Sequence, residues 1–302
     1  MELSIIILNY NTFALTCDCL RSIFQADCAP KSAEVILVDN GSTEQVPCSF
    51  QSLFPQIKFV RSEINLGFAK GNNLGIEIAT GEYIVLLNSD TVVKDGNIFE
   101  RCIQKVKSFA VPVAVTPQLL TADGRPQVAY GYLPSWKYEL LFNTFLYRLL
   151  NKRTLEKLLI SFVPEKNREI FNGYITATFF LFPRRMLQNL PNGKLYDETF
   201  LYGEELFWCA QWKKAGGLLF YYSDVAIIHL IGQSSNAAEK VEQRRRFQLR
   251  AEYAYLCWQY STPIALLFML FRMPRLLILS LRDTDMWLRM KLTLELLMHS
   301  TK

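Results

Sequence analysis

The sequence of 302 residues lacks most of the features that mark specialised protein classes. It has no internal repeat, no low-complexity tract and no long run of like charge, which disfavours solenoid and disordered classes. Its seven cysteines are odd in number and form no pairs with the repeated spacing of a zinc site. Half of the residues are hydrophobic, so the chain can bury a large core without disulfides. We therefore expect reduced thiols in a cytosolic protein.

The chain also lacks a clear targeting or membrane-spanning pattern. Its first residues, MELSIIILNY, include an acid and lack the basic segment and cleavage site of a signal peptide. The apolar run at residues 263–271 is soon broken by Arg272 and Arg275. A spanning helix needs roughly 20 apolar residues, so this run is expected not to span a membrane.

Positive charge is concentrated near the C-terminus. From residue 240 onwards there are eleven Lys and Arg and five Asp and Glu, a net charge of +6, against +5 for the whole chain, which leaves −1 for the rest. A basic tail that is also aromatic and apolar suggests attachment to an anionic membrane surface. A helical cap on the core and a dimer contact are alternatives with the same composition.

Alternating strand and helix patterns occupy the first ninety residues. Apolar runs at residues 3–8, 34–38 and 83–87 are typical of strands, and helical patterns lie between them at Phe13–Gln25 and 71–80. This order predicts a doubly wound α/β fold, in which ligands bind at the carboxyl ends of the strands. Each expected strand is followed by polar or turn-forming residues: Asn9, Tyr10 and Asn11; Asp39, Asn40 and Gly41; Asn88, Ser89 and Asp90.

The later elements are less regular, and two common nucleotide motifs are missing. The segment LNYNTFALT lacks the turn G-x-G-x-x-G, which disfavours a nicotinamide or flavin enzyme, and no P-loop occurs. We expect a basic helix at 147–162, an apolar run at 174–182 and a helix over Glu204–Lys214. LLFYYSDVAIIHL predicts two strands, and the residues after 240 predict helices.

Eight segments carry a family resemblance: SIIILNYNT, VILVDNGST, NLGFAKGNNLGI, YIVLLNSDT, DGRPQ, ITATFFLFPRR, YDETFLYGEE and IIHLIGQSS. In this order they resemble the family 2 glycosyltransferases of GT-A fold, and especially the rhamnosyltransferase-like branch. The resemblance implies a GT-A type, doubly wound, mixed but mainly parallel sheet. We expect a catalytic domain over residues 1–238, followed by a basic amphipathic helical tail over 239–302.

The resemblance also implies a reaction. It is the inverting transfer of a hexose or deoxyhexose, such as rhamnose, from a UDP- or dTDP-sugar to a hydroxyl of a bacterial surface glycan, with a lipid-linked acceptor. Mn²⁺ or Mg²⁺ would neutralise the leaving diphosphate. The expected location is cytoplasmic, peripheral to the inner face of the cell membrane. A non-catalytic nucleotide-sugar binder or a scaffold subunit is the alternative. Nucleic acid is disfavoured because the basic residues cluster beside apolar ones.

The motif positions assign metal and nucleotide roles to individual residues. Asp90 stands at the last place of the family's D-x-D motif, and His229 in IIHLIGQS is its expected partner as metal ligand; Ser234 would lie near the diphosphate. The alternatives are a turn former for Asp90 and a packed side chain for His229. The residues expected to bind the nucleotide sugar are Asn9, Asn11, Asp39, Asn65, Lys70, Asn73, Asn88 and Ser89.

The expected catalytic base departs from the family pattern. Glu205 stands where relatives have Asp, and Glu204 precedes it. The extra methylene moves the carboxylate by about 1.5 Å, and such a displacement can cost on the order of 100-fold in rate unless the pocket adapts. Two acids at a helix N-terminus are also favourable without catalysis. Phe207 and Gln211 replace an Asp and an Arg of the family, which indicates the exchange of a structural ion pair.

Two further segments differ from relatives. Ala177 stands where the family usually has Gly, so the acceptor side is expected to differ in shape. The segment at 243–247, QRRRF, resembles the Q-x-x-R-W of processive synthases. Those enzymes use a transmembrane channel, and we therefore interpret the segment as a basic helix face.

Overall fold

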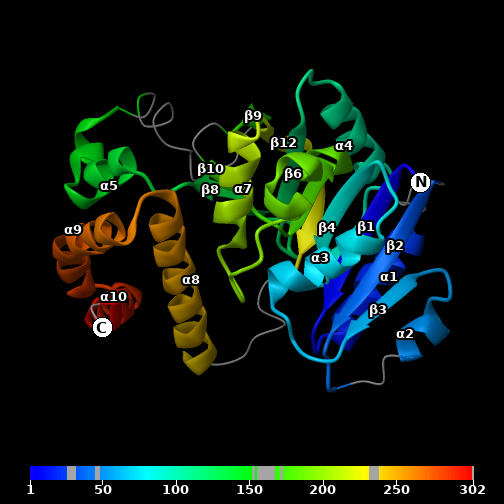
Figure 1. Cartoon of the computed structure of the whole chain (residues 1–302), viewed down its shortest axis with the longest axis horizontal. Coiled ribbons are helices and arrows are strands. Elements are labelled where there is room, and N and C mark those ends of the chain that lie inside the picture. The colour runs from blue at the N-terminus through cyan, green and yellow to red at the C-terminus, as the bar shows by residue number, and fades with distance from the viewer. Residues whose placement is uncertain are drawn as a thin grey trace.

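The computed structural model describes residues 1–25, 32–44, 48–151, 154, 167–170, 173–230 and 238–300. An α/β body built on one mixed sheet lies beside a layer of long C-terminal helices (Figure 1). The large sheet contains β1 (Leu3–Asn9), β2 (Ala33–Asn40), β3 (Lys58–Ser62), β4 (Tyr83–Asn88), β5 (Thr91–Val92), β6 (Val113–Leu120), β7 (Pro126–Gln127), β9 (Arg168–Glu169), β11 (Phe179–Pro183) and β12 (Leu218–His229). A small sheet pairs β8 (Tyr130–Tyr132) with β10 (Gly173–Ile175).

The strand order is β3-β2-β1-β4-β11-β6-β12-β5, with β7 on β6 and β9 on β12. β1 to β4 pair in parallel, and β6 pairs in parallel with β12, while β11 runs antiparallel between these two blocks. β1, β2 and β4 of the first block are buried on both faces, as in parallel sheets covered by helices, whereas β3 at the edge is only partly buried. The expected mixed, mainly parallel sheet is confirmed.

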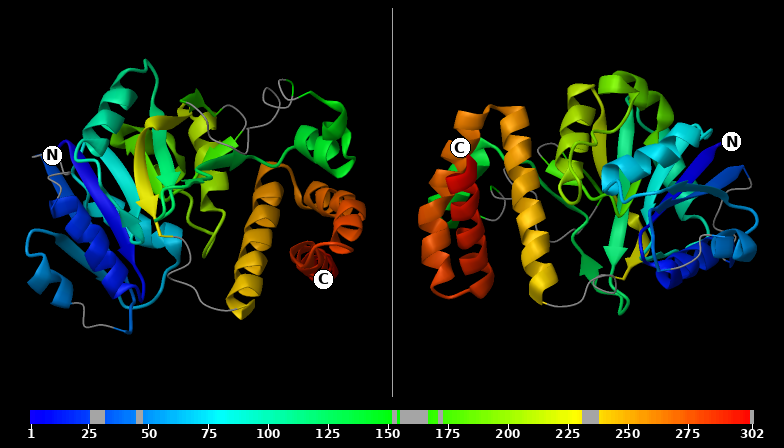
Figure 2. Two further views of the ribbon diagram at one scale, coloured as in Figure 1. Left: turned by 180° about the vertical axis from the view of Figure 1, so that it is seen from behind. Right: turned by 60° about the horizontal axis from the view of Figure 1, so that its bottom comes forward.

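Helices cover both faces of this sheet. The body contains α1 (Phe13–Gln25), α2 (Cys48–Leu53), α3 (Phe68–Ile78), α4 (Ile98–Lys107) and α7 (Glu204–Lys214), with the 3-10 turns η2 (Arg184–Asn189) and η3 (Pro191–Gly193). α1 and α3 lie on opposite faces (Figure 1, Figure 2). Gly71 and Gly75 let α3 approach β1 closely, since added Cβ atoms would lie 2.6 Å from Leu8 and 2.5 Å from Ile6.

A second layer, here called the helical layer, comprises α5 (Trp136–Asn143), η1 (Leu146–Leu149), α8 (Ala238–Gln259), α9 (Thr262–Ser280) and α10 (Thr284–Ser300). α8 stands between the body and the other helices (Figure 1). It packs on α7 through Phe207, whose ring centroid lies 5.6 Å from that of Tyr255 and 5.7 Å from that of Trp258. The helical tail expected after residue 240 is thereby confirmed, and residues 136–149 join it from the middle of the chain.

Several expected elements differ in detail. β3 was not predicted, and the strands expected in LLFYYSDVAIIHL are one strand, β12, with an irregularity between Tyr222 and Ala226. The apolar run at 174–182 divides into β10 and β11. The helix expected at 147–162 corresponds in part to η1, and most of that range lies outside the described residues.

The helix that contains the apolar run at 263–271 does not end at the arginines that follow the run. α9 continues through Arg272, Pro274 and Arg275 to Ser280. Among the described residues, α9 is the one helix whose length and composition would allow it to cross a membrane, with a mean hydropathy of 1.7. Its length alone does not decide whether it does so.

Candidate active site

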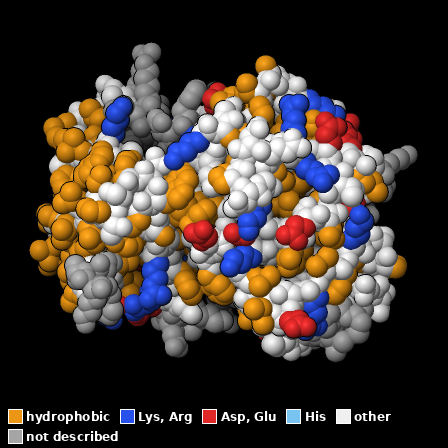
Figure 3. Space-filling model, viewed as in Figure 1, with side chains coloured by type: hydrophobic (Ala, Val, Ile, Leu, Met, Phe, Trp, Pro, Cys, Tyr) orange, Lys and Arg blue, Asp and Glu red, His pale blue; other side chains and the backbone are white. Residues whose placement is uncertain are grey.

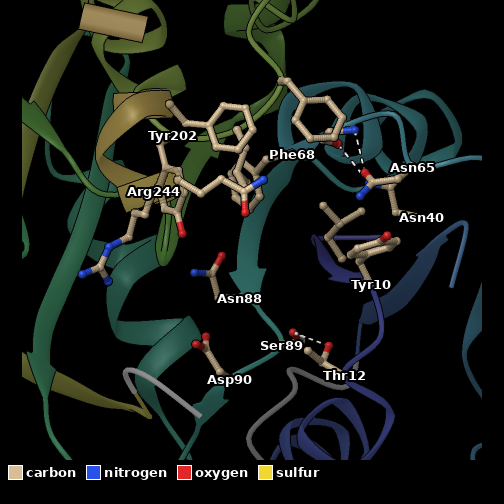
Figure 4. A pocket seen from close by; sticks show the side chains of 16 residues that line it. Tyr10, Thr12, Asn40, Asn65, Phe68, Asn88, Ser89, Asp90, Tyr202 and Arg244 are labelled. Carbon is tan, nitrogen blue, oxygen red and sulfur yellow. Dashed lines mark hydrogen bonds between the residues drawn. The ribbon is translucent and has the colours of Figure 1, made fainter. Parts of the chain in front are cut away.

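A cavity of about 550 Å³ opens at the carboxyl ends of β1, β2 and β4 (Figure 4). Its lining comes from three strand ends, two loops and one helix of the helical layer: Leu8, Tyr10, Thr12, Asn40, Asn65, Gly67, Phe68, Asn88, Ser89, Asp90, Phe200, Leu201, Tyr202, Gln243, Arg244 and Phe247. This is the edge at which doubly wound sheets bind ligands. Of the residues expected from the sequence, Asn65, Asn88, Ser89 and Asp90 line the cavity.

Asn9 and Asp39 form the buried wall behind the cavity rather than its lining. Each is 1% exposed, and the Asn9 amide donates to Asp39 Oδ1 at 2.8 Å and to Ser42 Oγ at 2.9 Å. Thr16 Oγ1 donates to Asn9 Oδ1, so the amide is fully oriented. Asp39 Oδ2 is buried without a hydrogen bond from the described residues, although Arg61 Nε lies 3.7 Å away. Asp39 Oδ2 is therefore an oxygen at this wall that can still accept a hydrogen bond.

Three other expected residues hold the surrounding chain. Asn11 has a positive φ of 52°, and its side-chain oxygen accepts the backbone N–H of Thr43 at 2.8 Å. The buried Asn73 donates to the carbonyl oxygen of Leu195 at 2.8 Å, which ties α3 to a distant loop. Lys70 is exposed on α3 and does not line the cavity.

The cavity wall formed by the loop before α3 requires a glycine at position 67. Asn40 donates to Asn65 Oδ1 at 3.0 Å and to the carbonyl oxygen of Gly67 at 3.1 Å, which fixes the loop before α3. Gly67 has a φ of 85°, and a Cβ there would lie 2.2 Å from the carbonyl oxygen of Phe200. The N–H of Phe68 donates to that same oxygen at 2.9 Å. The two loops that frame the cavity are thus joined directly, and only glycine fits the junction.

Asp90 and His229, the two expected metal ligands, lie next to each other at the far edge of the cavity, and their role as ligands stays a prediction. The pairing of β12 with β5 places His229 opposite Thr91, and Asp90 Oδ1 lies 3.4 Å from His229 Nε2. Gln127 Nε2 donates to the His229 carbonyl oxygen at 2.8 Å, so its Oε1 is the atom 3.0 Å from His229 Nδ1. Nδ1 therefore carries a hydrogen, and in the neutral ring Nε2 faces the carboxylate with its lone pair.

This pair has the chemistry of a cation site. An imidazole lone pair and a carboxylate oxygen that face each other fit a shared cation, and the Gln127 amide has the role of an outer partner that orients a ligating histidine. Across the described ranges, no group of three or more His, Cys, Asp or Glu side chains is placed to share an ion. A divalent cation held by Asp90 and His229 would therefore keep most of its coordination for other oxygen ligands.

Glu204 and Glu205 begin α7 after Gly203, which has a φ of 83°. Glu204 is 2% exposed, and its Oε1 has no hydrogen-bond partner among the described residues. Burial, with the negative charge of Glu205, raises the pKa of Glu204 to about 8. Burial also raises the pKa of Glu205, a half-buried residue whose Oε1 accepts the N–H of Ala177 at 3.3 Å. Neither carboxyl group lines the cavity.

Tyr202 connects the two parts of the site. It lines the cavity with a positive φ of 66°, two residues before Glu204. Burial raises the pKa of its phenol, and the nearby charges of Arg244 and Asp90 act on it as well. The cavity, the cation pair and the start of α7 are thus close enough to interact electrostatically.

The exchange of the family's Asp and Arg on α7 has a structural explanation. Phe207 is fully buried and stacks on Tyr196, with ring centroids 4.1 Å apart. Gln211 is buried as well, one turn later. An aromatic cluster that includes Tyr255 and Trp258 of α8 occupies this face of α7. The substitution belongs to the contact between the body and the helical layer.

The sequence analysis missed the contribution of α8 to the cavity. The expected basic face divides: Arg245 pairs with Asp285 at 3.0 Å, and Arg246 with Glu295 at 2.5 Å, but Arg244 lies at the cavity (Figure 4). Among the described residues that line the cavity, Arg244 is the one Lys or Arg. The resemblance of QRRRF to a synthase motif was the available signal. Ser234 lies outside the described residues.

Comparison with known proteins identifies the class. Residues 4–159, just over half of the chain, match the model of glycosyl transferase family 2, and the chain belongs to this family. It is 30% identical over 116 residues to the glycosyltransferase GlyG of Streptococcus pneumoniae, a match that covers 37% of this chain and 38% of that one. It is 32% identical over 129 residues to a poly-beta-1,6-N-acetyl-D-glucosamine synthase of Staphylococcus epidermidis, covering 42% and 29%. The chain spans well under half the length of these relatives.

Solved structures share the fold over most of the chain. The mannosyltransferase PcManGT of Pyrobaculum calidifontis, in complex with GDP-Man and Mn²⁺, has a TM-score of 0.56 at 14% identity, covering 93% of this chain and 76% of that one. TarS of S. aureus has a TM-score of 0.51 at 16% identity, covering 94% and 74%. At these identities the likeness concerns the fold, and the expected GT-A type architecture is confirmed.

Proposed function

We propose that this protein is a metal-dependent glycosyltransferase that moves a sugar from a nucleoside-diphosphate donor to a hydroxyl of a bacterial glycan. The observation that carries the proposal is the Asp90–His229 pair, with the imidazole oriented by Gln127, at the edge of a large cavity in a family 2 chain. The names of GlyG and of the glucosamine polymer synthase support glycan synthesis as the setting. The GDP-Man and Mn²⁺ bound to PcManGT support the type of donor and metal.

The donor would occupy the cavity with its diphosphate between Asp90 and Arg244. A volume of about 550 Å³ lies within the range of small-molecule sites. Tyr10 offers a partly exposed ring at the nucleoside end. Asp39 Oδ2, which accepts no hydrogen bond from the described residues, is an acceptor for a donor N–H or hydroxyl at the wall behind it. We assign UDP or dTDP as the nucleotide and a hexose or deoxyhexose, rhamnose included, as the sugar. These assignments rest on the resemblance of the motifs.

Mn²⁺ or Mg²⁺ held by Asp90 and His229 would supply positive charge to the leaving diphosphate. Arg244 supplies further positive charge from α8, and Asn88 and Ser89 offer neutral polar groups beside the cation pair. Gln127 keeps the imidazole hydrogen on Nδ1, so that Nε2 stays available as a ligand. Each of these residues prepares the site before the donor arrives.

Glu205 is our proposed base for an inverting, in-line attack, with Glu204 as its alternative. A carboxyl whose pKa is raised toward neutrality is a better proton acceptor than an ordinary one. The N–H of Ala177 donates a hydrogen bond to Glu205. Ala177 stands where the family usually has Gly and Glu205 where it has Asp, so the two replaced positions contact each other. The contact indicates how a longer carboxylate is accommodated. The acceptor is proposed to be lipid-linked, and the protein cytoplasmic and peripheral to the membrane.

Calorimetric titration with UDP- and dTDP-sugars, in Mn²⁺ and in EDTA, tests the proposal. We expect binding of one donor that requires metal, and its loss in Asp90→Asn but not in the matched control Asp95→Asn, whose side chain lies on another loop beside Arg101. Donor binding that needs no metal and persists in Asp90→Asn would contradict the proposed cation site.

Slow hydrolysis of the bound donor tests the base without a known acceptor. Glu205→Gln should keep donor binding and lose turnover, and the same result in Glu204→Gln alone would move the base to Glu204. Binding without any turnover in the wild-type protein would favour the alternative of a nucleotide-sugar-binding scaffold subunit. That outcome would contradict the proposed enzyme activity.

A further inference from the structure

The outward side of α9 is apolar along its whole length. Its exposed residues recur every three or four positions, so they form one stripe: Pro263, Leu267, Leu270, Phe271, Pro274, Leu277, Ile278 and, just beyond the helix, Leu281. The helix contains no Asp or Glu. A surface helix of a soluble domain normally exposes a polar stripe and buries an apolar one. α9 shows the reverse arrangement.

The arginines of α9 turn toward the protein instead. Arg272 Nε donates to Glu139 Oε2 of α5 at 2.7 Å, and Arg272 Nη2 lies 2.9 Å from Glu252 of α8. Glu139 is 1% exposed, so this ion pair is internal. Arg275 lies over the Phe142 ring, 5.5 Å from its centroid. Crossing a bilayer would require α9 to leave these partners, so its apolar stripe must be covered while the helix stays packed.

Neighbouring elements widen the stripe into a face. Exposed apolar side chains also lie on α5 (Trp136, Leu140), on η1 (Leu146, Leu149) and on α10 (Trp287, Leu294, Met298). Leu149 is 81% exposed and Leu281 80% exposed. Hydrophobic side chains dominate the side of the molecule formed by these helices (Figure 3). We call these side chains, with the α9 stripe, the apolar face. It is broader than a single helix seam and exceeds the scattered apolar residues of ordinary surfaces.

The charge around the apolar face is positive. Arg148 and Arg282 are exposed, and Arg148 lies over the Phe145 ring at 4.8 Å. Of the nearby acids, Asp285 is paired with Arg245 and Arg289, and Glu295 with Arg246. Asp283 is exposed beside Arg282, but with Lys137 of α5 also exposed the exposed charges remain positive on balance. In a symmetric dimer, each copy would bring the same positive rim to the contact, which opposes association. Anionic headgroups above an apolar phase complement both the rim and the face.

From this arrangement we propose that the apolar face docks on an anionic membrane with α9 lying along the interface. The stripe enters the boundary between headgroups and acyl chains, and the exposed arginines reach the headgroups. The internal Arg272–Glu139 pair keeps α9 on the protein as the face docks. Docking brings the body and its cavity to the membrane as one unit, because α8 contacts α7 of the body and also contacts α9 of the apolar face. The proposal extends the peripheral location above, and it is tested without donor or metal.

Co-sedimentation of the full chain with vesicles tests the proposal. We expect binding to vesicles of phosphatidylcholine mixed with phosphatidylglycerol, at least about tenfold weaker binding to phosphatidylcholine alone, and weakening by salt. The double variant Leu270→Glu/Leu277→Glu should reduce binding by about 100-fold, because two stripe residues become charged. The matched control Leu53→Glu/Val111→Glu changes exposed residues of the body and should bind as the wild type does.

Two further measurements keep the result decisive. Brominated acyl chains should quench Trp287 in the wild-type protein, measured as the difference from Trp287→Phe, even if the double variant does not fold. Sedimentation velocity without lipid should give a monomer. Wild-type protein that stays in solution with anionic vesicles would overturn the proposal. So would a dimer that the stripe variant dissociates, since a second copy would then cover the face. Neither outcome would bear on donor binding, so failure of the docking proposal is distinct from failure of the proposed function.

Discussion

Replacing Glu204 with glutamine should stabilise the folded protein at neutral pH. Burial raises the pKa of this carboxyl from 4.5 to about 8. Between these values the folded protein binds one proton more than the unfolded chain, so the free energy of unfolding falls as pH rises. The slope is about 1.4 kcal/mol per pH unit, which amounts to roughly 3 kcal/mol by pH 7. Glutamine has no such titration, and it keeps an oxygen for the backbone N–H groups that the carboxylate accepts.

Urea unfolding of the wild type and of Glu204→Gln, from about pH 5 to about pH 8, measures this difference. The two curves should nearly coincide at the acidic end and diverge as pH rises, with the variant the more stable. Glu100→Gln is the matched control, because its carboxyl is exposed on α4, and it should leave the slope unchanged. Glu205→Gln should reduce the slope in part, since the negative charge of Glu205 contributes to the shift. Parallel curves for the wild type and Glu204→Gln would refute the reasoning.

Two other predictions follow from charged residues of the helical layer. Arg272→Met should cost about 3–5 kcal/mol in chemical denaturation by leaving Glu139 buried without its partner. Adding Glu139→Gln should recover part of that loss, and an unchanged double variant would contradict the assignment. Arg244→Ala should weaken donor binding, measured by calorimetry, by about tenfold or more. Arg250 is exposed on the same helix, and Arg250→Ala should leave the affinity unchanged. Equal effects of the two variants would argue against a contact between Arg244 and the diphosphate.

The parts of the fold that local pattern determines were predictable. The three apolar runs became β1, β2 and β4, and α7 has the expected bounds, because a glycine in a left-handed conformation precedes it and Gly216 follows it. β3 was missed because KFVRS is only partly buried and carries two cations. β12 was divided in the prediction because Ser223 and Asp224 resemble a turn, whereas the sheet absorbs them in an irregularity.

The site was predictable where two strand ends must meet. Asp90 follows β4 and His229 ends β12 of the same sheet, and the two come together at its edge. A position after a strand does not tell whether a side chain enters the wall or the cavity, and for Asn9 that depends on Ser42 and Thr16. The place of Arg244 depends on how α8 packs against α7, a tertiary contact that no local pattern encodes.

The pair of Arg272 and Glu139 has a consequence for how the chain is made. The two residues are 133 positions apart in the sequence. At ordinary rates of synthesis, roughly ten seconds separate their emergence from the ribosome. During that interval the growing chain has neither the cation that neutralises Glu139 nor the α8 wall of the cavity, because both are encoded later. A nascent chain must keep Glu139 hydrated until its last third emerges, and a cavity complete with Arg244 forms only near the end of translation.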